Sequence, residues 1–216
     1  MQILFKYDEN MDMKCLLSKG AGSNNSPTKM TKTYELLVSQ VDDLGDETKV
    51  KEFIRRFIRE NNIDIANNLS EINKNWIEVA NKFEEIATRI FRTNLNQDIT
   101  AYLTITGRYP YDTKENYFYV SLLKTNTNAT IMHELWHFYT YAKFGDYIDT
   151  IGASKYNDIK EALTVLLNIE CKDLLGEEVD SGYPQHKDLR EKITQLWADK
   201  RDIEYVWSSL QRQIEG

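Results

Sequence analysis

The apolar residues between positions 70 and 91 recur with the 3.6-residue period of an α-helix, and this run is the strongest constraint on the fold of the 216-residue chain. The stripe consists of Ile72, Trp76, Val79, Ala80, Phe83, Ile86, Ala87 and Ile90. Charged side chains fill the opposite face, and Ser70 is a typical N-cap residue. We therefore expect one long amphipathic helix over 70–91.

The hydrophobic period then changes to the two-residue alternation of a β-strand. Residues 99–106 alternate, and residues 117–123 are β-branched, aromatic and apolar, so both segments predict strands. Turn residues between them favour a long-looped hairpin. A short strand is also expected at 2–7, and the Gly-, Ser- and Asn-rich segment 18–31 is typical of a loop.

Helical spacing returns in four other segments, which are 48–59, 129–144, 157–175 and 187–212. Thr127 or Asn128 is available as the N-cap of the second segment, and Gly145 and Gly176 end the second and third. These elements predict an α+β fold, mainly helical, with a small, mostly antiparallel sheet. We expect a single domain over 1–216, with an N-terminal part (1–98), a central part (99–175) and a C-terminal helical part (176–216).

Composition limits the classes of protein that this chain can be. A hydrophobic fraction of 41% with only three prolines and nine glycines excludes a collagen-like or wholly disordered chain. The net charge of -7 leaves no surplus of cations for a phosphate backbone, so we expect no nucleic-acid partner. Two cysteines are too few for a disulfide framework. With neither a secretory signal nor an apolar run of roughly 20 residues, we expect a cytoplasmic protein and no membrane partner.

Two of the three histidines lie in the motif His133-Glu134-Leu135-Trp136-His137, inside the helix expected at 129–144. Residues four apart project from one helix face, so both imidazoles can reach a single cation. Glu134 would lie beside that cation, where it can accept a proton from a bound water. About 0.003 chance occurrences of this pattern are expected in such a chain. The motif therefore indicates a catalytic zinc site.

Such a site needs a third protein ligand, and Glu161 is the leading candidate. It lies 24 residues after His137. It comes early in a helix that is otherwise strongly apolar, where a carboxylate is costly to bury unless it is paired or binds a cation. The other candidates are Asp146, Asp149, Glu170 and His186.

On these residues the chain resembles a zincin metallopeptidase of the gluzincin branch, to which thermolysin belongs. The resemblance covers about 99–175 and implies a zincin-like fold, in which the small sheet packs on the metal-site helix. It makes His133 and His137 the zinc ligands, Glu134 the general base and Glu161 the third ligand. A metzincin would carry Gly and His where this chain has Thr140 and Lys143.

The chain departs from the gluzincin pattern four residues after Glu161. Members of that branch often carry an acidic residue there, which orients a histidine ligand, whereas this chain has Val165. The orienting partner could instead be Asp158, Thr164 or Asn168. The sequence leaves these three alternatives open.

The resemblance implies a metallopeptidase with one zinc ion per chain, which hydrolyses peptide bonds of a peptide or protein substrate by metal-activated water. His186 and Tyr183 are candidate donors to the oxyanion, because they lie in a turn that enters the last helix. Residues 116–119 are nominated as the exposed strand edge along which a peptide would lie. The alternative is a catalytically inactive zincin-fold module that binds zinc or another protein. Neither the cleavage specificity nor the oligomeric state follows from the sequence.

Overall fold

The computed structural model describes residues 1–18 and 31–214, so most of the loop expected at 18–31 lies outside the described residues. The chain separates into two compact units. The first comprises Met1–Glu78 and Asn96–Thr127, and the second comprises Val79–Leu95 and the described residues from Asn128 onward. The division therefore follows different boundaries from the three parts expected within one domain.

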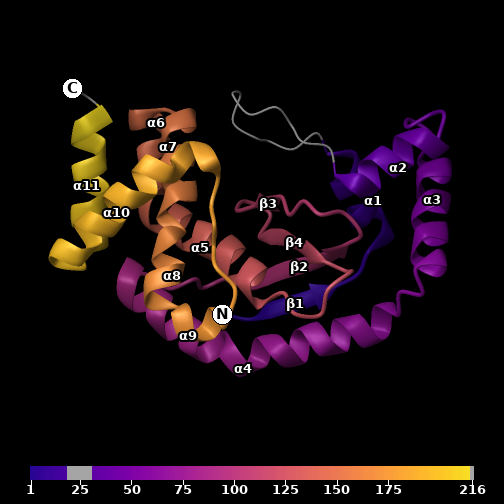
Figure 1. The fold of residues 1–216 in the computed structure, drawn as a ribbon, viewed down its shortest axis with the longest axis horizontal. Helices are drawn as coiled ribbons and strands as arrows, with labels where there is room; N and C mark the ends of the chain where they lie inside the picture. Colours follow the sequence, from indigo (N-terminus) through magenta and orange to yellow (C-terminus); the bar gives the residue numbers. More distant parts are fainter. Residues whose placement is uncertain (19–30, 215–216) are drawn as a thin grey trace. The chain divides into compact units, whose positions relative to one another are not determined.

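The first unit contains a four-stranded mixed sheet in the order β1-β2-β4-β3 (Figure 1). The strands are β1 (Ile3–Lys6), β2 (Ile99–Thr104), β3 (Tyr111–Asp112) and β4 (Tyr117–Ser121). The β1-β2 and β2-β4 pairs are parallel, and only β3-β4 is antiparallel. An α+β fold is confirmed, whereas the expectation of a mostly antiparallel sheet is wrong.

The turn chemistry after β3 explains why β2 and β4 do not form the expected hairpin. The Asp112 carboxylate accepts hydrogen bonds from the backbone N–H groups of Lys114 and Glu115. Asn116 then takes a positive φ of 55°, a conformation that Asn tolerates better than most residues. The tight turn therefore joins β3 to β4.

Strand β4 lies inside the sheet and offers no edge to a peptide over 117–119. Phe118 is opposite Ala101 of β2 on one side and Tyr111 of β3 on the other. The backbone N–H of Tyr119 also donates to the Pro110 carbonyl. The nomination of 116–119 as an exposed edge is therefore wrong. The expected packing of the sheet on the helix at 129–144 remains a prediction.

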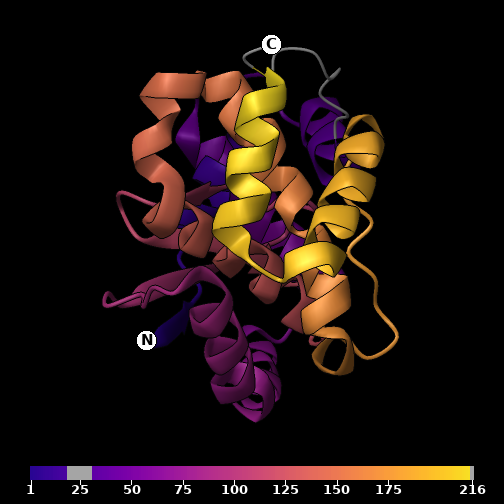
Figure 2. The same ribbon diagram turned by 90° about the vertical axis from the view of Figure 1, so that its left-hand side faces the viewer.

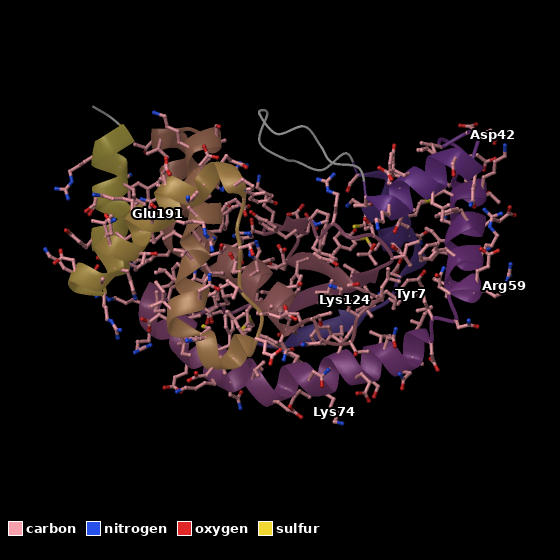
Figure 3. The ribbon with its side chains drawn as sticks, in the orientation of Figure 1. Tyr7, Asp42, Arg59, Lys74, Lys124 and Glu191 are labelled. Carbon is pink, nitrogen blue, oxygen red and sulfur yellow. The ribbon has the colours of Figure 1, made fainter. Side chains whose placement is uncertain are left out.

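The helices of the first unit begin at side-chain caps. They are α1 (Glu9–Leu17), α2 (Lys32–Gln40) and α3 (Glu47–Glu60), capped by Asp8, Thr31 and Asp46. Figure 3 labels Asp42 just before α3 and Arg59 in its last turn. Helix α4 (Ile65–Phe91) starts earlier than expected, because Asp64 accepts from the N–H of Asn67. Ser70 therefore lies inside the helix and does not cap it.

Among the residues that the structure describes, the regular secondary structure of the second unit consists of helices (Figure 2). After the last part of α4 it comprises α5 (Asn128–Phe144), η1 (Gly145–Tyr147), α6 (Ile148–Ile151), α7 (Ala153–Leu163), α8 (Val165–Glu170), α9 (Lys172–Leu175), η2 (Pro184–His186), α10 (Lys187–Lys200) and α11 (Ile203–Ile214). Helix α10 packs against α7, α8 and α11. Within residues 1–18 and 31–214, no helix is both long and apolar enough to cross a membrane.

Two of the expected helices are interrupted. The helix expected at 157–175 is divided into α7, α8 and α9: i to i+3 hydrogen bonds interrupt the α-helical pattern around Thr164, and Cys171 separates α8 from α9. The helix expected at 187–212 is broken at Arg201, whose φ of 47° is left-handed. Asp202 then caps α11 by accepting from the N–H of Tyr205.

Trp136 is the centre of an aromatic core in the second unit. It is fully buried, and its ring contacts Phe83 and Phe91 of α4. Its indole N–H donates to the Leu163 carbonyl at the end of α7. These contacts fix α5 against both α4 and α7, and the histidines of the motif are on α5.

A buried carboxylate joins α1 to the sheet in the first unit. Asp12 is fully buried and accepts hydrogen bonds from the Thr104 hydroxyl at 2.7 Å and the Ile105 N–H at 3.1 Å. Burial raises its pKa to about 6 in spite of those bonds. The pKa of Tyr7, labelled in Figure 3, is raised by its own burial and by the Asp12 carboxylate.

We predict that Asp12→Asn removes a pH-dependent loss of stability. The pKa is higher in the folded chain, so the native state holds the proton more tightly and the wild type loses stability as pH rises from about 4 through about 6. The loss approaches about 3 kcal/mol. Urea unfolding of both proteins at pH 4 to 7 measures it. Parallel pH profiles of the two proteins would contradict the prediction.

Candidate metal centre

Helix α5 places the two histidines of the motif side by side. Their Nε2 atoms are 3.0 Å apart, and the ring centroids are separated by 4.6 Å at a steep angle of 83°. The helix begins at Asn128, in agreement with the sequence, so His133 and His137 lie one turn apart on one face. Both imidazoles therefore point their Nε2 atoms at a common position.

Helix α7 contributes a third ligand atom at this position. Glu161 Oε2 lies 3.4 Å from His137 Nε2 and 3.7 Å from His133 Nε2. A tetrahedral ion bound at about 2.05 Å separates its ligand atoms by about 3.3 Å, a value within the range of these three distances. His133, His137 and Glu161 could therefore hold a metal ion, and Glu161 is brought into the cluster as the sequence predicted.

A residue that the sequence did not single out orients His133. Asp180, in the loop between α9 and η2, has its Oδ2 atom 2.5 Å from Nδ1 of His133. Because an ionised carboxylate only accepts hydrogen bonds, Nδ1 is the donor, and Nε2 is left to face the cluster. Asp180 is one of 34 acidic residues, and no spacing rule marks it in the sequence.

Three side chains hold the loop around Asp180 in place. The Asn168 amide of α8 donates to the backbone carbonyl of Asp180 and accepts from its backbone N–H, both at 2.8 Å. Arg190 of α10 pairs with Oδ1 at 2.9 Å, and the Thr164 hydroxyl donates to the same oxygen. Gly182 has a φ of +61°, which favours glycine, and a Cβ there would lie 2.6 Å from the Arg190 guanidinium, so any other residue would force Arg190 to shift.

The three residues considered as orienting partners of a histidine ligand have other contacts. Thr164 and Asn168 contact Asp180 and therefore affect His133 only through that aspartate. Asp158 lies 3.0 Å from Nε2 of His186. The carboxylate that orients His133 therefore comes from a loop rather than from the helix that supplies Glu161.

Glu134 is buried beside the cluster. It is only 5% exposed, and its Oε2 atom makes no hydrogen bond within the part of the chain that the structure describes. Burial raises its pKa to about 8, although the charge of His133 acts in the opposite direction. A buried carboxylate with an unsatisfied oxygen is a strong base once ionised, and it is costly to keep without a function.

The pKa values of the other three groups in the cluster are shifted in different directions. Burial lowers the pKa of His133, but hydrogen bonds to Asp180 and Glu161 outweigh it and raise the value to about 10. Burial lowers the pKa of His137 to about 3. Burial disfavours ionised Glu161, yet His137 and the bond to His133 hold its pKa well below the usual range. A metal ion bound here would have to displace the proton from Nε2 of His133.

The remaining candidates from the sequence lie outside this cluster. Asp146 and Asp149 are exposed, and Glu170 pairs with Arg89 and accepts from the Trp197 indole. His186 is buried against Asp158, and its ring contacts that of Tyr183, which is 52% exposed. The proposed oxyanion role of His186 and Tyr183 remains a prediction.

Comparison of the chain with protein-family models, with curated proteins and with solved structures finds no match. The residues of the site and their geometry are therefore the only guide to the function.

We predict that Asp180→Asn weakens the affinity of this cluster for Zn²⁺, added as the probe ion, by about 10- to 100-fold, because the amide removes the charge that fixes the ring of His133. Competition with a chromophoric chelator measures the affinity. Asp173→Asn, an exposed aspartate of α9, is the matched control and should bind zinc as the wild type does. Unchanged affinity in Asp180→Asn would show that His133 needs no such partner.

Proposed function

We propose that this chain is a zinc-dependent metallopeptidase. The observation that carries the proposal is the convergence of His133 Nε2, His137 Nε2 and Glu161 Oε2, with the buried carboxylate of Glu134 next in the chain to one ligand. Two imidazoles and one carboxylate form a donor set found in catalytic zinc sites.

The donor atoms favour zinc over the hard cations. Ca²⁺ and Mg²⁺ prefer six or more oxygen ligands, whereas this cluster offers two nitrogens and one oxygen. Bound zinc supplies a Lewis acid, which polarises a carbonyl group and makes water easier to deprotonate. Three protein ligands leave one tetrahedral position for the reacting molecule.

Each residue of the site then has a separate task. His133, His137 and Glu161 hold the ion, and Asp180 fixes the tautomer of His133 through Nδ1. Glu134 accepts a proton from the attacking water on its free oxygen. It later returns this proton to the leaving amine, so no net proton change occurs on the carboxylate.

A peptide substrate is inferred from the resemblance of the motif to gluzincins. Glu134 distinguishes this proposal from an inactive zinc module, because a structural zinc site needs no buried acid beside it. An inactive module would tolerate Glu134→Gln without functional loss, which makes this substitution the decisive one.

We predict about one zinc ion per chain in purified protein. The Glu134→Gln variant should retain this zinc and lose about 10²- to 10⁴-fold in peptidase activity. Metal analysis by mass spectrometry and release of dye from fluorescein-labelled casein measure the two quantities. Glu161→Ala should lose both zinc and activity, because it removes one of three ligands.

Glu191→Gln is the matched control, since Glu191 is an exposed residue of α10 (Figure 3). It should leave zinc content and casein cleavage unchanged. The proposal is wrong if the wild-type chain does not bind zinc, or if zinc-loaded Glu134→Gln cleaves casein at the wild-type rate.

A further inference from the structure

Lys160 is a buried cation next to the proposed ligand Glu161. On α7 it interrupts an apolar stripe that continues through Tyr156 and Leu163, and it is only 5% exposed. Burying an ammonium group is strongly unfavourable unless an acidic partner compensates for the lost hydration. A lysine at this position therefore requires a carboxylate within reach.

The two oxygens of Glu161 face different partners. Oε1 lies 2.9 Å from the ammonium nitrogen of Lys160, whereas Oε2 faces the two imidazoles at 3.4 and 3.7 Å. The ammonium group and Oε1 therefore form a close, largely buried ion pair. Only one oxygen of Glu161 is then directed at the ligand position.

We propose that Lys160 makes Glu161 a one-oxygen ligand and thereby keeps a coordination position open for the substrate or water. A carboxylate that bound through both oxygens would fill, together with His133 and His137, all four positions of a tetrahedral ion. Such a closed shell is typical of structural zinc sites. The inference rests on the proposed function, because an open position matters only where a molecule must react.

Lys160 is therefore a positioning residue, which acts through Glu161. A plain ion pair would make a different contribution: it would stabilise the fold and leave the arrangement of ligands as it is. The two roles differ in the bonds that Glu161 makes to the metal and in the accessibility of the fourth position. Both can be measured without an assay of catalysis.

Crystal structures of the zinc-loaded full chain as wild type, Lys160→Met and Lys160→Arg test the inference. Methionine matches the length of lysine but carries no charge or donor, and arginine retains both. We expect one Glu161 oxygen at roughly 2.0–2.2 Å from zinc in the wild type and in Lys160→Arg, and both oxygens bonded in Lys160→Met.

Titration with acetohydroxamate, a zinc chelator, probes the open position in solution. It should bind zinc-loaded Lys160→Met about tenfold or more weakly than the wild type. Lys155→Met removes an exposed lysine from the same helix and should bind the probe as the wild type does.

The outcomes separate the inference from the proposed function. Equal acetohydroxamate affinity and one-oxygen ligation in Lys160→Met would overturn the role of Lys160 and leave the zinc site intact. A wild-type chain that binds no zinc would overturn both. If Lys160→Met does not fold, the zinc-loaded wild-type crystal structure tests the inference by itself. Zinc bound to both oxygens of Glu161 contradicts the inference. Zinc bound to one oxygen, with Lys160 paired to Oε1, supports it.

Discussion

The contact between His133 and Asp180 is the interaction on which the rest of the candidate site depends. It joins a helix to a loop 47 residues further along the chain, and it directs His133 Nε2 toward His137 and Glu161. The same aspartate is held by Arg190 of α10 and by Thr164 between α7 and α8, so both places are tied to this one side chain. Gly182 makes the arrangement possible, because any side chain there would displace the arginine.

Charge balance explains why so many ionisable groups can be buried together. Glu134, Glu161 and Asp180 bring acidic groups into the interior of the second unit, and Lys160 and Arg190 supply the compensating cations. A buried charge without a partner would destabilise the fold by several kcal/mol. Most of these groups are paired, whereas Glu134 keeps an unsatisfied oxygen. This exception is the feature that most favours a chemical role for the cluster.

Local patterns predicted some elements well and others poorly. Helices α3 and α5 follow from apolar spacing and were expected within two residues of their observed ends. Helix α1 was missed because Asp12, in its middle, faces the interior and breaks the apolar pattern. The parallel pairing of β2 with β4 was also missed, because strand patterns specify faces but not neighbours. Asp158 was considered as the orienting partner of a histidine of the motif and instead pairs with His186.

The sequence by itself determined that His133, Glu134 and His137 are neighbours, because helical geometry fixes which side chains share a face over one turn. Spacing and polarity also selected Glu161 from among the acidic residues. Only the tertiary structure brought Asp180 to His133 and buried Lys160, the sequence neighbour of Glu161, with its ammonium group at one oxygen of that glutamate. The physical reason is that these contacts depend on how helices and loops pack and on which buried charges need partners, and neither property is encoded in local spacing.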